Sequence, residues 1–128
     1  ASAQFPTSGK QPGWTRDSYG YHGDDGNVFF ASGTGREYGP QFGAGDTVGV
    51  GLDYFSGSIF FTKNGCYLGS AFKKPLLPVP LFPVVGIDAN WKLSLNFGSF
   101  PFRFDISGFE KHCFLKRHEQ ILKNRREL

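Results

Sequence analysis

Residues 47–72 read TVGVGLDYFSGSIFFTKNGCYLGSAF, and this stretch decides the fold. In residues 47–54 valine and leucine alternate with glycine and aspartate, so the apolar side chains share one face of a strand. Residues 59–62 are a second run with high β propensity. Asn64-Gly65 is a strong signal for a tight hairpin, and a third strand then extends from residue 66 to about residue 72. The stretch predicts three successive antiparallel strands.

Similar signals on both sides of this stretch predict further short strands. Gly23-Asp24-Asp25-Gly26 is a turn signal, because Asp-Gly readily adopts the positive φ that a tight hairpin needs. From residue 91 to residue 97 apolar and polar residues alternate again. Strands separated by turns at intervals of about 8–12 residues indicate an all-β sandwich or barrel of antiparallel sheets. The additional predicted strands are residues 18–22, 27–31, 82–87, 91–97 and 102–106.

The composition fits one folded domain. The 128 residues include 15 Phe, 5 Tyr and 2 Trp, which is enough aromatic bulk for a hydrophobic core. No segment approaches the ~20 apolar residues of a membrane span, and no signal peptide is visible at the N-terminus. Cys66 and Cys113 are too few for a disulfide scaffold and are expected to be free thiols. Free thiols favour a reducing compartment, so we expect a cytoplasmic or nuclear protein.

The net charge of +3 comes from the C-terminal tail. Residues 1–109 carry eight Lys/Arg and eight Asp/Glu, whereas residues 110–128 carry six Lys/Arg and three Glu. The body is therefore neutral, which gives poor support for nucleic-acid binding. Residues 109–126 show an imperfect apolar stripe that predicts a helix starting at Gly108. We expect a solvated helix here, and contact with an acidic partner is the alternative.

The sequence contains no convincing catalytic or metal-binding constellation. His22 with Asp24 and Asp25 is the one cluster with metal-ligand chemistry, but the turn already explains both aspartates. No serine lies in a GxSxG elbow, and the glycine loops lack the Lys-Ser/Thr of a phosphate cradle. A carboxylate pair such as Asp24 with Asp88 is conceivable for glycoside hydrolysis, but sequence cannot set its spacing. We therefore predict a protein that is not an enzyme and needs no cofactor or metal.

Aromatic and polar side chains in and beside loops are the unusual feature of this chain. Such amphipathic aromatics contribute much of the energy of partner-binding surfaces. Core packing is the competing interpretation, evenly balanced for Trp14 and Tyr19 and slightly favoured for Trp91. The candidate residues are Trp14, Tyr19, Tyr21, Asp88, Asn90 and Trp91.

Seven short blocks follow one another along the chain: PGW at 12–14, SYGYHGDDG at 18–26, YGP at 38–40, GDTVG at 45–49, FFTKNG at 60–65, LFPVVG at 81–86 and NFG at 96–98. Together they closely resemble the SPRY (B30.2-like) domain of the Ran-binding protein M group. The resemblance covers roughly residues 12–106, and the number of ordered blocks makes it specific at the family level. It implies a β-sandwich of two antiparallel sheets, in agreement with the strand pattern.

The resemblance also implies a protein-interaction module without catalysis. In this family the ligand surface is shallow and is built by loops at one edge of the sandwich. The loop that includes Tyr21 and His22 resembles one wall, and the loop from residue 87 to residue 91 resembles another. The Ran-binding protein M group supplies a scaffold subunit of the CTLH or GID ubiquitin ligase, in which the SPRY domain docks a substrate receptor or another partner. The implied partner-binding residues are Tyr21, His22, Asp88, Asn90 and Trp91, with Tyr19 added. On this interpretation, Tyr21→Ala is expected to weaken binding without unfolding the domain.

Other functions stay open at this point. Related SPRY proteins act as ligase adaptors or as secreted effectors, so the fold alone does not choose the pathway. A glycan-binding sandwich of the lectin type is an alternative from another class, motivated by the same loop aromatics and acids.

Two departures from the family pattern set further expectations. The family's domain normally begins with several strands before the Pro-Gly-Trp block, but only eleven residues precede that block here. We therefore expect residues 1–107 to form an N-terminally incomplete SPRY domain, which an additional segment would complete. Residues 108–128 are expected to be a basic helical extension that does not clearly show the LisH motif of the ligase scaffolds.

Overall fold

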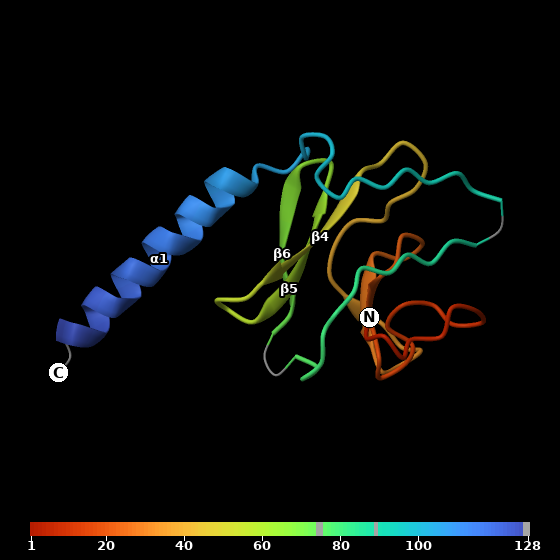
Figure 1. Ribbon diagram of the computed structural model, residues 1–128, viewed down its shortest axis with the longest axis horizontal. Helices are drawn as coiled ribbons and strands as arrows, with labels where there is room; N and C mark the ends of the chain where they lie inside the picture. Colours follow the sequence, from red (N-terminus) through yellow and green to blue (C-terminus); the bar gives the residue numbers. More distant parts are fainter. Residues whose placement is uncertain (74–75, 89, 127–128) are drawn as a thin grey trace.

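The computed structural model describes residues 1–73, 76–88 and 90–126, and within them the chain folds into two antiparallel three-stranded sheets and one helix (Figure 1). The all-β antiparallel sandwich with a C-terminal helix, predicted from the sequence, is confirmed. The first sheet has the order β1-β2-β3 and the second β4-β5-β6. The elements are β1 (Tyr19–Tyr21), β2 (Asn27–Phe30), β3 (Arg36–Glu37), β4 (Val48–Asp53), β5 (Ser58–Lys63), β6 (Cys66–Phe72) and α1 (Ile106–Arg126).

The second sheet is formed by the segment whose sequence has the strongest turn and strand signals. Asn64 and Gly65 both have positive φ, 50° and 85°, which is the geometry of the tight turn that joins β5 to β6. The turn between β4 and β5 is held by Asp53, whose Oδ1 accepts a hydrogen bond of 2.9 Å from the backbone N–H of Phe55. Val50 pairs with Phe61 in the β4–β5 register. The three strands predicted in residues 47–72 are confirmed.

The first sheet is built around the predicted Asp-Gly turn. Gly26 has a φ of 75°, and the carboxylate of Asp25 accepts hydrogen bonds of 2.9 Å from both the backbone N–H and the side-chain amide of Asn27. This places Tyr21 opposite Val28 in the β1–β2 pair. The turn role predicted for this segment is therefore confirmed for Asp25.

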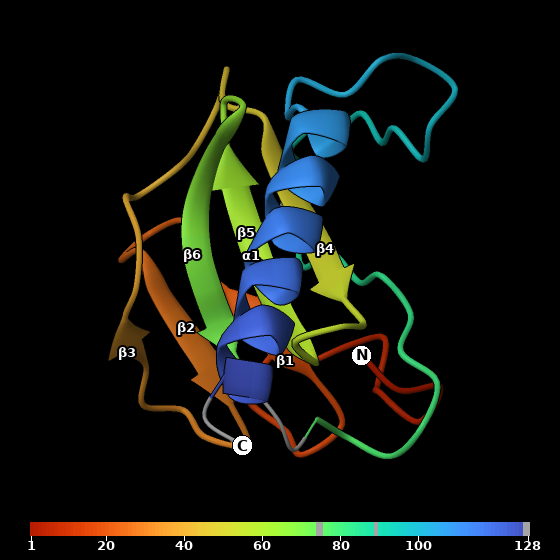
Figure 2. The ribbon, with the colours of Figure 1, turned by 90° about the vertical axis from the view of Figure 1, so that its left-hand side faces the viewer.

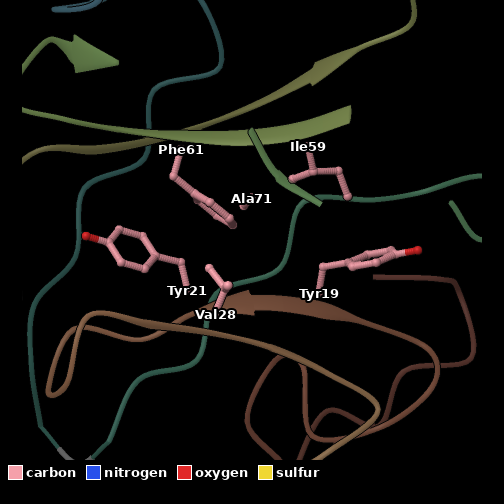
Figure 3. Packing of buried hydrophobic residues seen from close by; sticks show 6 residues of the cluster. All are labelled: Tyr19, Tyr21, Val28, Ile59, Phe61 and Ala71. Atoms are coloured by element: carbon pink, nitrogen blue, oxygen red, sulfur yellow. The ribbon is translucent and has the colours of Figure 1, made fainter. Parts of the chain in front are cut away.

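The core lies between the two sheets (Figure 3). In this view Tyr19, Tyr21 and Val28 from the first sheet point toward Ile59, Phe61 and Ala71 from the second. The ring of Tyr21 lies 5.1 Å from that of Phe61 and 5.3 Å from that of Tyr38, centroid to centroid. Each large side chain buried in this way contributes about 1.5–3 kcal/mol to folding, so the aromatic layer is a major source of stability.

Three predicted strands do not form. In the described parts of residues 76–105 the chain runs without strand structure, although 82–87, 91–97 and 102–106 were predicted as strands. Alternation of apolar residues marks a face, but a strand also needs a partner for its backbone hydrogen bonds. Within the described residues this segment has one isolated backbone pairing, in which Phe82 exchanges two hydrogen bonds of 2.7 Å with the distant Ala1. The alternating residues from 91 to 97 are exposed.

The helix α1 begins earlier than predicted, at Ile106 instead of Gly108, because Asp105 caps it. The Oδ1 atom of Asp105 accepts a hydrogen bond of 2.9 Å from the backbone N–H of Gly108, which would otherwise lack an acceptor in the first turn. Phe109 then packs on Phe60 of β5 at 4.9 Å. Figures 1 and 2 show α1 leaving the second sheet on the side away from the first sheet.

Candidate partner-binding site

The structure places Tyr19 and Tyr21 in the core, where they have only 9% and 8% exposure. The hydroxyl of Tyr19 accepts a hydrogen bond of 2.9 Å from the backbone N–H of Leu77, and the hydroxyl of Tyr21 donates one to the carbonyl of Pro40. Burial, and secondarily the charge of Asp46, raise the pKa of Tyr21, so its phenol stays protonated at neutral pH. These contacts argue against the expectation that Tyr21→Ala leaves the fold intact.

His22 lies on the opposite face of the first sheet, because successive residues of a strand alternate in direction. Its ring stacks on Phe29 with the centroids 4.0 Å apart and the planes at 22°. Its Nε2 lies 2.8 Å from the carbonyl oxygen of Pro12, which can only accept, so Nε2 carries the proton and donates. The indole of Trp14 lies 6.3 Å away, centroid to centroid, and is 43% exposed. His22 therefore anchors a loop that presents an exposed aromatic side chain.

A glycine in β1 allows this loop to approach the sheet. A Cβ atom at Gly20 would collide with the carbonyl oxygen of Pro12 and would lie 3.2 Å from Nε2 of His22. The loop at residues 11–14 therefore packs directly on the sheet backbone, which a larger side chain in place of Gly20 would prevent.

The same loop connects the first predicted wall to the second. A Cβ atom at Gly86 would collide with the side-chain oxygen of Gln11 and would lie 2.9 Å from Cδ of Pro12. Pro12 thus lies between His22 and Gly86, and it brings two segments more than sixty residues apart into contact.

The remaining predicted residues follow directly after Gly86. Asp88, Asn90 and Trp91 are exposed, and the indole of Trp91 has 69% exposure. In the part of the chain that the structure describes, no hydrogen bond or ring contact joins these three residues to His22. The structure therefore joins the two segments at Pro12 and Gly86 and leaves the polar tip of the second segment open to solvent.

Sequence reasoning missed Gln11, Pro12 and Gly86 as members of this surface. The Pro-Gly-Trp block stands out in the sequence, but only its tryptophan has the chemistry typical of a binding residue. The signal that could have identified the others is the pair of glycines at positions 20 and 86, because a glycine often marks a position that another segment of the chain approaches closely.

Elsewhere on the protein, an open apolar groove of about 1570 Å³ runs along β4, one of the two edge strands of the second sheet. It lies between residues 81–85 and the first turns of α1, and Val50, Phe55, Leu95 and Phe102 are among its lining residues. Its lining is mainly hydrophobic, with few groups that could take part in chemistry. The groove is separate from the surface at His22 and Gly86.

Side chains that could bind a metal or act as nucleophiles are spread apart in the described residues. Within residues 1–73, 76–88 and 90–126, no group of three or more His, Cys, Asp and Glu side chains is close enough to hold a metal ion. Cys66 and Cys113 are free thiols. Burial raises the pKa of the Cys113 thiol, with a smaller effect of Asp53 in the same direction. A raised pKa leaves less reactive thiolate at neutral pH.

The comparisons with known proteins agree with this fold. The SPRY domain family matches residues 1–100, and the chain belongs to that family. A solved human SPRY domain is 37% identical, with a TM-score of 0.51 over 55% of this chain and 46% of that one. No helix in the described residues combines the length and the apolar character needed to cross a membrane.

Within the family, the chain is similar to the Ran-binding proteins. It is 44% identical to Ran-binding protein 9 of Homo sapiens over 121 residues, covering 94% of this chain and 16% of that protein. It is 46% identical to the Ran-binding proteins 9/10 homolog of Drosophila melanogaster (81% and 11%) and 44% identical to the Ran-binding protein M homolog of Arabidopsis thaliana (79% and 21%). The chain spans about a fifth or less of the length of these three relatives.

Proposed function

We propose that this chain is a non-catalytic protein-interaction module, the SPRY domain by which a ubiquitin-ligase scaffold or adaptor of the CTLH/GID type docks a partner or substrate receptor. Membership of the SPRY family and similarity to Ran-binding proteins 9, 10 and M support the interaction role. The two free cysteines fit a cytoplasmic or nuclear location, where thiols stay reduced.

The observation that carries the proposal is the junction at Pro12, where the loop anchored by His22 meets the segment that continues to Trp91. The proposed contact residues for the partner are His22, Asp88, Asn90 and Trp91. Tyr19 and Tyr21 contribute to the site indirectly. Their rings fix β1 in the core and thereby fix the position of His22.

The chemistry of the proposed contact residues fits a protein partner. An exposed indole offers a large apolar surface and one N–H donor, and such residues dominate the binding energy of many interfaces. Asp88 and Asn90 add one charged and one neutral hydrogen-bonding group, which favours a partner segment with matched donors. Binding to a surface that is already folded avoids part of the ordering cost of association.

A pull-down with quantitative mass spectrometry tests this function. The intact chain, immobilised and incubated with cell extract, should enrich ubiquitin-ligase subunits or their substrate receptors above a matched resin control. The same capture should be weaker with a Trp91→Ala variant that retains its thermal unfolding profile. Recovery of no ligase component by the folded wild-type chain would count against the ligase assignment. A positive glycan array together with an empty pull-down would favour the lectin-type alternative instead.

A further inference from the structure

The helix α1 repeats one pattern at a spacing of seven residues. Leu115 and Leu122 form one pair, and Phe114 and Ile121 form a second pair beside it. A basic or ionisable side chain recurs at the same interval in the same stripe, at Lys111, His118 and Arg125. Residues seven apart lie on the same side of a helix, so these seven residues form one continuous surface, which we call the heptad stripe.

The centre of the heptad stripe points away from the side of α1 that contacts the sheet, although Lys111, Phe114 and Leu115 also line the apolar groove along β4. The contacts of α1 with the sheet come from another side, where Phe109 packs on Phe60 and the guanidinium of Arg117 lies 4.1 Å above the ring of Phe55. Cys113 lies four residues after Phe109 and four residues before Arg117, and it is partly buried. At 3.6 residues per turn the centre of the stripe is rotated about 140° from this contact side. Figure 1 shows the C-terminal half of α1 projecting beyond the sheet.

The apolar members of the stripe are therefore open to solvent. Phe114 is 67% exposed and Leu115 is 60% exposed, and Ile121 and Leu122 are each 43% exposed. Four large apolar side chains exposed on one side of α1, with ionisable side chains between them, form a patch that can contact another protein.

Charge selects the kind of partner. Within the described residues 110–126 the helix has six Lys/Arg and two Glu, and Lys111 and Arg125 lie inside the apolar stripe. A second copy of α1 would bring two strongly basic helices together, which electrostatic repulsion opposes. An anionic membrane would receive Lys111 and Arg125 on the side that must enter the apolar layer, not on the headgroup side. A partner helix that has apolar side chains opposite the apolar positions, and carboxylates opposite Lys111 and Arg125, matches both the apolar and the basic side chains of the stripe.

We propose that α1 is a docking helix for an acidic amphipathic helix of a protein partner. Phe114, Leu115, Ile121 and Leu122 supply the apolar contact, and Lys111 and Arg125 pair with carboxylates of the partner. These charge pairs would set the register, because a shift of the partner helix along the stripe leaves its carboxylates opposite apolar side chains. The site lies outside residues 1–100 and does not involve His22 or Trp91, so it can fail or succeed independently of the proposed SPRY function.

The experiment uses the full chain and two synthetic helical peptides of three heptads. The first peptide carries Leu and Glu at its interface positions, and the second has the same sequence with Lys in place of each Glu. Fluorescence anisotropy should detect saturable binding of the first peptide only. The double variant Lys111→Glu/Arg125→Glu should weaken binding about tenfold or more, as expected for the loss of close charge pairs at an interface.

A matched control separates the stripe from general attraction to a basic tail. Lys116→Glu/Lys123→Glu makes the same change of net charge on another side of α1, and it should weaken binding only about threefold or less. Equal losses for both double variants would overturn the proposal. So would concentration-dependent self-association, or binding to phosphatidylserine vesicles without binding to the acidic peptide. Circular dichroism of each variant confirms that the helix is retained.

Discussion

The Nε2 atom of His22 lies 2.8 Å from the carbonyl oxygen of Pro12, on the face of the first sheet opposite the core. This contact connects the strand β1, which is fixed by two buried tyrosines, to the loop that packs against Gly86. The order of the proposed binding surface therefore depends in part on His22, beside the hydrogen bond of 2.7 Å that the backbone N–H of Gly13 donates to Oγ of Ser18. Substitutions can separate the role of His22 in holding the loop from the role of the two tyrosines in the core.

His22→Ala should loosen the loop at residues 11–14 without unfolding the protein. The change removes the stack on Phe29 and the hydrogen bond to Pro12, each worth about 0.5–1.5 kcal/mol. Hydrogen exchange should accelerate at the amide of Trp14, which donates to Gln11 at 3.1 Å. His112→Ala on the exposed helix is the matched control. Unchanged exchange at Trp14 would show that His22 does not anchor the loop.

Trp91→Ala should weaken capture of the partner and leave the free energy of unfolding within about 0.5 kcal/mol of the wild-type value, because the indole is exposed. Tyr54→Ala, at the β4–β5 turn and 85% exposed, controls for the loss of any surface aromatic. Calorimetry measures stability, and partner capture is compared across the three proteins. Equal capture by the wild type and Trp91→Ala would remove Trp91 from the proposed surface.

Tyr21 should respond very differently to two substitutions. Tyr21→Ala leaves a cavity among Phe61, Tyr38 and Phe42 and should cost about 3–5 kcal/mol. Tyr21→Phe keeps the ring and loses only the hydrogen bond to Pro40, at a cost of about 1 kcal/mol. Urea denaturation measures both values. If Tyr21→Ala proved as stable as Tyr21→Phe, the ring would not be part of the core.

The sequence predicts the parts of this fold that depend on neighbouring residues. Asn64-Gly65 fixes the β5–β6 hairpin through backbone conformation alone, and the valine–glycine alternation fixes which side chains of β4 share a face. The sequence pattern predicts that α1 starts at Gly108, two residues too late, because the side chain of Asp105 decides where the helix begins.

The sequence does not predict which strands distant in the chain pair with one another. Residues 91–97 alternate as a strand would, but alternation cannot tell whether a partner backbone is present, and these residues are exposed without one in the described structure. The same limit affects the site. A period of two shows that Tyr19 and Tyr21 share a face and that His22 faces the other way, but only the second sheet determines which face is buried.

Asp46 should make stability depend on pH in the acid range. Its carboxylate accepts hydrogen bonds from the Asn64 side chain at 2.8 Å and the Gly43 backbone at 3.1 Å, and Lys63 lies 3.5 Å away. These contacts, that of Asn64 first, hold the pKa of Asp46 below its ordinary value of 3.8. A lowered folded-state pKa stabilises the protein above the unfolded value, and this stabilisation is lost as pH falls through the folded value.

The wild type should therefore be more stable than Asp46→Asn at pH 5 and above, and the difference should shrink as pH falls below about 3.8. Chemical denaturation across this range gives the difference directly and cancels the effect of the other acids. In an Asn64→Gly background, which keeps the positive φ of the turn, the pH-dependent part should be smaller because the main hydrogen bond is gone. A difference that stays constant with pH would show that the charge of Asp46 contributes nothing to folding.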